Sequence, residues 1–204
     1  MLSTTRIDAV AERSPRVREA MEVATSAHAG QIRNGSGGRP YIEHPLAVAE
    51  LLAEHDFPEP VLAAALLHDV VEESPIEVEE IGRRFGPEVG ELVAALTDAE
   101  EIEHYGHRKT VHRAEVAAAG EEALAIYAAD KLSNIRALRR VYARQGEDVG
   151  AGLKAPLDAK VEVWEADVEI LRERAPQLPF LAELEAELSL LVAARAAAGP
   201  RRDI

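Results

Sequence analysis

One imidazole and three carboxylates lie close together near the end of an apolar segment. The stretch VLAAALLHDVVEES, residues 61–74, is apolar until it reaches His68 and Asp69. Glu72 and Glu73 follow within one helical turn. Residues three or four positions apart share a helix face, so these four side chains would form one patch. Because burying uncompensated carboxylates is costly, the patch indicates either a cation site or a helix end that emerges into solvent.

Two further segments carry polar residues where apolar ones are expected. AADKLSN places Asp130, Lys131 and Asn134 inside an otherwise apolar helix, and YIEHP places His44 at a helix entrance. Two imidazoles and two carboxylates from three helices form a mixed nitrogen and oxygen set, which suits Mn²⁺, Fe²⁺, Mg²⁺ or Zn²⁺. The candidate metal ligands are His44, His68, Asp69 and Asp130.

A metal at this patch would leave positions open for water and a substrate. A divalent cation lowers the pKa of the water that it binds and acts as a Lewis acid. Glu72 lies one turn from His68, so it could position or deprotonate a water molecule, or protonate the leaving oxygen. Glu73 is the second candidate for this role. The sequence therefore predicts Glu72 and Glu73 as the catalytic carboxylates.

The elements that would position these residues are helices. Apolar residues follow helical spacing along nearly the whole chain, and strand-like alternation is missing, so we expect an all-α fold. Ser74 precedes Pro75 and Glu77 in the pattern of a helix start, with Ser74 as its cap. Residues 98–120 are polar, and only their second half could be helical. The expected helices span residues 17–28, 45–54, 61–73, 75–85, 87–97, 124–144, 157–171 and 180–198.

Composition limits the partners that the chain can have. Its 204 residues include 23 Lys and Arg against 37 Asp and Glu, which gives a formal net charge of −14. This excess repels a phosphate backbone, so we expect no nucleic-acid partner, although a cation or a local basic cluster could bind a small phosphorylated molecule. The chain has no cysteine, which fits a reducing cytosol. No export signal or apolar run of membrane-spanning length is recognisable, so we expect a cytoplasmic protein without a membrane partner.

The order H…HD…D resembles the HD superfamily of metal-dependent phosphohydrolases. More narrowly, HAGQIRNGSGGRPYIEHPLAVAELL, AALLHDVVEES, FGPEV and AADKLSNIRAL are similar to the hydrolase domain of the RelA/SpoT family and its small stand-alone members. The similarity covers about residues 15–145. It implies an HD-domain helical bundle and a Mn²⁺-dependent hydrolase that removes the 3′-pyrophosphate of a nucleotide substrate, (p)ppGpp.

Carried over by position, the resemblance assigns roles to individual residues. It implies that Asn134 contacts the nucleotide and that Arg33 lies along the guanine base. The implied metal ligands are His44, His68, Asp69 and Asp130, the implied acidic pair is Glu72 and Glu73, and the substrate-binding candidates are Arg33, Asn34, Lys131 and Asn134.

The chain departs from the family pattern at two places. The family usually has Arg-Lys where this chain has Arg33-Asn34, so one cation near the substrate is replaced by an amide. Arg39, in the same loop, could supply the lost charge. The acidic pair of the family is usually Glu-Asp, whereas here it is Glu72-Glu73, which keeps the charge and lengthens the second side chain by one methylene.

Other polar residues have two possible interpretations. His104, His107 and His112 could bind a second metal, but their polar stretch favours solvent exposure. Arg108, Lys109 and Arg113 could meet the outer phosphates of a substrate or form a solvated face, and the sequence leaves both open.

The domain organisation and the function also have alternatives. We expect residues 1–145 to form the hydrolase domain and residues 146–204 to form a C-terminal helical extension that packs on it and could provide a homodimer surface. No synthetase half is expected after the matching region. Another HD hydrolase activity, on a dNTP, a nucleoside monophosphate or NADPH, is the first alternative. A non-catalytic alarmone sensor is the second, although binding alone would not require Asp69 together with Asp130.

Overall fold

The computed structural model describes residues 5–33, 36–98 and 102–198. Within these ranges the regular structure is helical, apart from one isolated bridge between Ile32 and Pro40, which confirms the predicted all-α fold. The α-helices are α1 (Arg6–Arg13), α2 (Pro15–Ala27), α3 (Glu43–Glu54), α4 (Glu59–Leu67), α5 (Val70–Glu73), α6 (Val78–Phe85), α7 (Pro87–Leu96), α8 (Tyr105–Ala119), α9 (Glu121–Gln145), α10 (Leu157–Arg174) and α11 (Leu181–Ala198). A 3₁₀ helix, η1 (Gly146–Gly152), follows α9.

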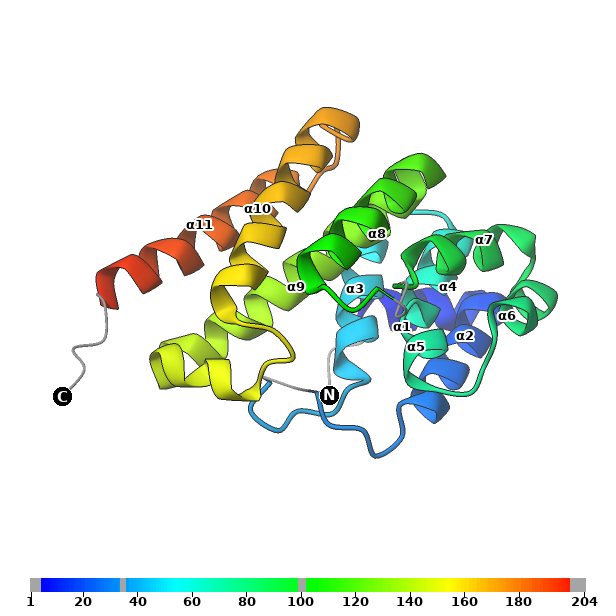
Figure 1. The fold of residues 1–204 in the computed structure, drawn as a ribbon. Coiled ribbons are helices and arrows are strands. Elements are labelled where there is room, and N and C mark those ends of the chain that lie inside the picture. Colours follow the sequence, from blue (N-terminus) through cyan, green and yellow to red (C-terminus); the bar gives the residue numbers. More distant parts are fainter. Residues whose placement is uncertain (1–4, 34–35, 99–101, 199–204) are drawn as a thin grey trace.

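The helix α4 forms the centre of the fold. Its residues from Val61 to Leu67 are at most 2% exposed, as expected for a helix that is apolar on every side. It packs against α2, α3, α7 and α9. The long helix α9 crosses the molecule between α3 and α4 on one side and α8, α10 and α11 on the other (Figure 1). Segments far apart in the sequence therefore meet along α9.

The prediction of one uninterrupted helix over residues 61–73 was wrong. The helix ends at Leu67, and α5 starts at Val70. Nδ1 of His68 lies 2.8 Å from the carbonyl oxygen of Ala65, which an uninterrupted helix would use for the N–H of Asp69. A side chain that bonds the backbone in this way competes with the helical ladder. The break occurs at the two residues with the strongest chemical signal in the sequence.

The predicted cap at Ser74 was also wrong. The hydroxyl of Ser74 donates a hydrogen bond to the carbonyl of Val70 at 2.7 Å and accepts one from the N–H of Ile76 at 3.3 Å. Ser74 therefore ends α5, whereas α6 begins at Val78 with Glu77 as its cap residue. The predicted end of this helix at Phe85 and the start of the next at Pro87 are confirmed.

The polar segment after Thr97 is more helical than the sequence predicts. Helix α8 covers Tyr105–Ala119, and Nδ1 of His104 accepts a hydrogen bond from the N–H of His107 at its start. Helix α8 packs on α7, α9 and α10. This helix completes the wall of the site described below.

The two C-terminal helices pack on the rest of the fold through α8 and α9 (Figure 1). Trp164 on α10 is only 5% exposed, and Arg139 on α9 bonds Glu187 on α11 at 2.6 Å. The division at residue 145 stays a prediction, as does a homodimer through these helices, where Leu190 and Val192 are exposed. No helix in the described ranges is both long enough and apolar enough to span a membrane.

Candidate active site

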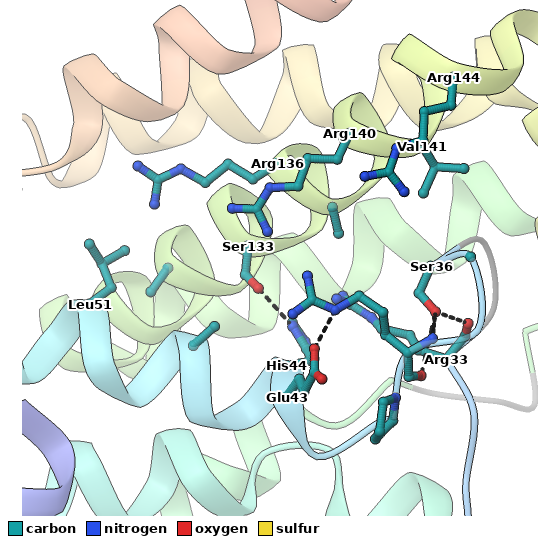
Figure 2. A pocket seen from close by; sticks show the side chains of 16 residues that line it. Arg33, Ser36, Glu43, His44, Leu51, Ser133, Arg136, Arg140, Val141 and Arg144 are labelled. Atoms are coloured by element: carbon teal, nitrogen blue, oxygen red, sulfur yellow. Dashed lines mark hydrogen bonds and ion pairs between the residues drawn. The ribbon is translucent and has the colours of Figure 1, made fainter. Parts of the chain in front are cut away.

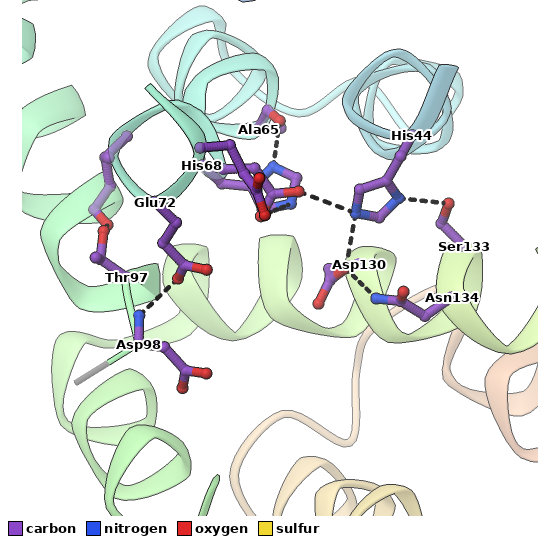
Figure 3. A network of polar contacts seen from close by, with 12 residues as sticks. His44, Ala65, His68, Glu72, Thr97, Asp98, Asp130, Ser133 and Asn134 are labelled. Carbon is purple, nitrogen blue, oxygen red and sulfur yellow. Dashed lines mark hydrogen bonds and ion pairs between the residues drawn. The ribbon is translucent and has the colours of Figure 1, made fainter. Parts of the chain in front are cut away.

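Three of the four predicted metal ligands form a tight buried cluster. His44 lies in the first turn of α3, His68 follows α4, and Asp130 lies in the middle of α9. One ligand atom from each of these residues lies within 4.8 Å of the other two. Nε2 of His44 is 3.0 Å from Oδ1 of Asp130, and both imidazoles are almost completely buried (Figure 3). The meeting of α3, α4 and α9 thus brings together residues that are distant in sequence.

The second nitrogen of each imidazole determines which atom faces the cluster. Nδ1 of His68 contacts the carbonyl of Ala65, which can only accept a hydrogen bond, so Nδ1 carries the proton. Nδ1 of His44 lies 3.0 Å from the hydroxyl of Ser133. Each Nε2 is therefore directed toward the cluster, in the arrangement that metal-binding histidines usually have.

The described residues fit a divalent cation. Nε2 of His68 is buried and makes no hydrogen bond, although Oδ1 of Asp69 lies 3.3 Å away. Burial lowers the pKa of His44, which favours the neutral form that binds metals. An unpaired buried nitrogen beside neutral imidazole and ionised carboxylate oxygens is a donor set that a borderline divalent ion prefers.

The carboxylates of the cluster are held ionised by their neighbours. Burial alone would raise the pKa of Asp130, but Nζ of Lys131 at 2.8 Å from Oδ2 and the nearby His44 keep it well below its usual value. Burial would likewise raise the pKa of Asp69, yet His68 and His44 lower it. An ionised carboxylate is the form that binds a cation.

Asp69 lies beside the cluster but outside its tightest group. Its Oδ2 accepts a hydrogen bond from the hydroxyl of Tyr41 at 2.9 Å and lies 3.5 Å from Nε2 of His44. The ring of Tyr41 stacks on His28, at 4.6 Å between ring centroids. Tyr41 thus orients a predicted ligand. Nothing in the sequence pattern marked Tyr41, although it stands only three residues before His44.

The two predicted catalytic carboxylates occupy different environments. Oε1 of Glu72 accepts a hydrogen bond from the N–H of Asp98 at 2.7 Å (Figure 3). Burial, together with the charge of Asp69, raises the pKa of Glu72 to about 7. In contrast, Glu73 is more open, and its Oε1 lies 3.5 Å from Nζ of Lys154. Glu72 therefore has the environment expected of a group that exchanges protons near neutral pH.

A cavity of about 660 Å³ opens beside the cluster. It is lined by both carboxylates of the acidic pair and by aromatic side chains, including Tyr105 and Trp164. Its basic lining residues are Arg33, Arg108, Lys109, Lys131, Lys154 and Lys160, and its acidic ones are Asp69, Glu72, Glu73, Asp98 and Asp130. Cations and carboxylates are thus nearly balanced around this cavity, whereas the whole chain has a net charge of −14.

One of the three histidines predicted to be exposed is buried. His112 is 4% exposed, lines the cavity, and has its Nδ1 3.2 Å from Oδ1 of Asp98. Asp98 also pairs with Lys109. The prediction failed because α8 turns this face toward α7, α9 and α10, a contact that the polar local sequence does not indicate. His104 and His107 are exposed, as predicted.

The basic run on α8 divides between two environments. Arg108 and Lys109 line the cavity. Arg113 instead bonds Oδ1 of the buried Asp167 at 2.6 Å, and the hydroxyl of Tyr127 donates to the same oxygen at 2.9 Å. The first two residues can therefore meet a ligand, whereas Arg113 stabilises the packing of α8 against α10.

The predicted substrate-binding residues connect to the cluster. Nη2 of Arg33 donates to Oδ1 of Asn134 at 2.7 Å, and Nδ2 of Asn134 donates to Oδ1 of Asp130. Lys131 bonds Asp130 and lies over the ring of Tyr127, 4.1 Å from its centroid. Asn34, the remaining candidate, lies outside the described residues.

Comparison with known proteins identifies relatives of this site. Residues 20–159 match the model of the HD domain family. A probable GTP pyrophosphokinase of Mycobacterium leprae is 40% identical over 126 residues, which are 60% of this chain and 16% of that protein. The bifunctional (p)ppGpp synthase/hydrolase SpoT of Escherichia coli K12 is 45% identical over 87 residues, which are 43% of this chain and 12% of that protein. The match thus spans less than a fifth of each of these relatives.

A solved structure resembles this fold over most of both chains. It is described as a metazoan ortholog of SpoT that hydrolyzes ppGpp and has a role in starvation responses. The two proteins are 28% identical, with a TM-score of 0.67, and the match covers 89% of this chain and 96% of the other.

Proposed function

The chain belongs to the HD domain family, and we propose that it is a Mn²⁺-dependent hydrolase that removes the 3′-pyrophosphate of (p)ppGpp. The observation that carries this proposal is the buried cluster of His44, His68 and Asp130 beside a cavity that is lined by Glu72 and several Lys and Arg residues. The similarity to the metazoan structure supports the same substrate.

The cation would be held by the nitrogen atoms of His44 and His68 and by the carboxylates of Asp130 and Asp69. When bound, a divalent cation acts as a Lewis acid on phosphoryl oxygens and lowers the pKa of water. The protein contributes the orientation of the ligands: Ser133 holds His44, and the backbone of Ala65 holds His68. Tyr41 similarly orients Asp69.

Glu72 is the proton-transfer group in this proposal. Water attacks the phosphorus bonded to the 3′ oxygen, that P–O bond breaks, and the products are a 5′-phosphorylated guanosine and pyrophosphate. Glu72 accepts the proton of the attacking water and can return it to the departing 3′ oxygen. The N–H of Asp98 fixes one carboxylate oxygen, which keeps the other free for this exchange.

The basic residues of the cavity would receive the pyrophosphate. Lys160 has a pKa lowered to about 8, first by burial and then by the charges of Lys109 and Lys131. Cations that repel one another in this way are stabilised when an anion enters between them. The cavity therefore favours a substrate with several negative charges at the end that is cleaved.

The nucleoside part would lie along Arg33. A guanidinium plane stacks on a purine and distinguishes guanine from adenine only weakly. Asn134, which bonds Arg33, would face the sugar. In this proposal the specificity for the alarmone comes chiefly from the 3′-pyrophosphate rather than from the base.

The test is a screen of nucleotides with Mn²⁺, with the products identified by mass spectrometry. We expect ppGpp to yield GDP and pyrophosphate, whereas GTP and dGTP, which lack a 3′-phosphate, remain intact. Cleavage of dGTP, a nucleoside monophosphate or NADPH without cleavage of ppGpp would reject the alarmone as the substrate. Tight binding of ppGpp without any turnover would instead favour a sensor.

A further inference from the structure

A second cavity, of about 420 Å³, adjoins the cavity beside the candidate metal cluster. Arg33 and His44 line both cavities. The walls of the second cavity come from α3, α9 and the loop that carries Ser36 (Figure 2). A ligand that lies along Arg33 would therefore border both cavities.

Hydrogen bonds of Ser36 order residues 36–39 at the rim of the second cavity. The buried hydroxyl of Ser36 donates to the carbonyl of Arg33 at 2.7 Å and accepts from the N–H of Arg39 at 3.0 Å. Gly37 and Gly38 have φ values of +73° and +91°, which residues with a side chain rarely adopt. Both arginines of this loop, Arg33 and Arg39, line the cavity.

The second cavity has a strongly positive lining. The described residues around it include five arginines and a single carboxylate, Glu43. Glu43 forms an ion pair with Arg39, and Arg136 pairs with Glu183 and Glu187 on α11. The arginines at the cavity are Arg33, Arg39, Arg136, Arg140 and Arg144.

Two of these arginines have no ion-pair or hydrogen-bond partner among the described residues. Arg140 and Arg144 are exposed and stand one turn apart on α9 (Figure 2). Two positive charges at this spacing destabilise a helix slightly, so this pair does not stabilise α9. The chain contains 37 Asp and Glu residues against 23 Lys and Arg, so carboxylates that could pair with these two arginines are abundant in the sequence. The pair is therefore available for an anionic ligand.

We propose that Arg140 and Arg144 bind the 5′-phosphate groups of the nucleotide whose 3′-pyrophosphate lies in the first cavity. This inference rests on the proposed function, because a nucleotide phosphorylated at both ends is a ligand whose two ends could occupy the two cavities that share Arg33. Guanidinium groups suit this role, since they bind phosphate oxygens in pairs and remain charged.

A steady-state comparison tests the proposal with three nucleotides that share the 3′-pyrophosphate. These carry three, two or no phosphates at the 5′ position. The double variant Arg140→Gln/Arg144→Gln is expected to raise KM for the first two by about tenfold and to leave the third within about twofold, since it loses only contacts to the 5′ end. The turnover number kcat should change little. An equal rise for all three nucleotides would mean that the arginines hold the base, and would overturn the proposal.

The matched control removes two positive charges elsewhere. Arg16 and Arg18 are exposed on α2, and Arg16→Gln/Arg18→Gln changes the net charge by the same amount. The proposal predicts that this control leaves all three KM values unchanged. If the control raised KM as much as Arg140→Gln/Arg144→Gln does, the change would reflect general electrostatic attraction. That result would contradict a specific subsite.

A binding measurement separates this inference from the proposed activity. Calorimetric titration with GDP and with guanosine requires no turnover. GDP should bind the wild type about tenfold more tightly than the Arg140→Gln/Arg144→Gln variant, whereas guanosine should not distinguish the two. Equal affinity of the wild type and this variant for GDP would overturn the proposed 5′-phosphate subsite, even if ppGpp is hydrolysed. Failure to hydrolyse any of the three nucleotides would reject the proposed function and leave the GDP result to decide the subsite.

Discussion

The guanidinium of Arg33 donates a hydrogen bond of 2.7 Å to the side-chain carbonyl of Asn134, which lies 101 positions later in the chain. The amide of Asn134 in turn bonds Asp130. One side chain therefore connects the loop that would hold the base with a carboxylate that would hold the metal. Changes in Arg33 should consequently affect binding of the nucleoside more than the metal cluster itself.

Replacing Arg33 by Ala should raise KM for ppGpp by about tenfold, because stacking on the base is lost. The turnover number should fall less, since the contact is equally present before and during the reaction. Steady-state kinetics at saturating Mn²⁺ measure both parameters. A large fall in kcat with an unchanged KM would assign Arg33 to the chemical step.

Replacing Asp130 by Asn should abolish metal uptake, because the buried cluster loses its charged oxygen. The variant should also lose the rise in melting temperature that metal gives the wild type, which corresponds to about 2.7 kcal/mol at a metal concentration one hundred times Kd. Elemental analysis and thermal unfolding with and without a chelator provide the measurements. Asp98→Asn, a carboxylate outside the cluster, should retain the metal. Full metal content in Asp130→Asn would remove this residue from the ligand set.

Replacing Asp69 by Ala should also prevent metal uptake, as the family resemblance implies. The geometry allows a graded test, since Tyr41→Phe removes only the hydroxyl that donates to Asp69. This milder variant should weaken metal affinity by roughly tenfold, the lower end of the range for groups that orient a ligand. Unchanged affinity in both variants would leave His44, His68 and Asp130 as the protein ligands.

Replacing Glu72 by Gln should lower turnover by roughly 10²-fold or more, the usual scale for a general acid or base, and leave metal content unchanged. Glu73→Gln should have a smaller effect, because Glu73 is more exposed and lies near Lys154. The two variants have the same change in charge and size, so each is the control for the other. If Glu73→Gln were inactive and Glu72→Gln active, the two roles would be reversed.

The pH dependence of the wild type should follow the ionisation of Glu72. Burial raises the pKa of this carboxyl to about 7 in the metal-free protein, and a nearby cation lowers it. As a base, Glu72 must be ionised, so kcat/KM should rise with pH up to a midpoint at or below about 7. Glu72→Gln should lack this acidic limb.

The same raised pKa has a consequence for stability without metal. The folded state binds the proton of Glu72 more tightly than the unfolded state, so this group stabilises the fold below its unfolded pKa. That contribution declines as the pH rises toward the folded pKa of about 7. The unfolding free energy of the wild type, relative to that of Glu72→Gln, should therefore fall as the pH rises toward about 7. Denaturant titrations at pH 4.5 and 7.5 measure it.

Helical periodicity and the H…HD…D order predicted much of what the structure contains. The apolar stripe of α9 and the apolar surface of α4 are local patterns, and each is visible in a short window of sequence. The candidate ligands His44, His68 and Asp130 stand out because each is a polar residue in an apolar setting. The structure places them close together, while their role as ligands stays a prediction.

The features that the sequence analysis missed depend on contacts between distant segments. The backbone N–H of Asp98 donates to Glu72, and a backbone contact of this kind cannot be inferred from the type of residue at position 98. His112 is buried because α8 packs between neighbouring helices, although its own segment is polar. The break at His68 arises from competition between a side chain and the backbone for one carbonyl. None of these can be seen from periodicity.

The residues of the candidate metal site lie in or beside helices that long stretches of chain separate. A cation held by all of them would connect α3, α4 and α9 as a cross-link does, in a chain that has no cysteine for disulfide bonds. Such a link makes local opening less favourable in the helices that it joins than in helices that hold no ligand. Amide hydrogen exchange should therefore slow on metal loading in α3, α4 and the middle of α9, while α6, which holds no ligand, should exchange at the same rate with or without the ion.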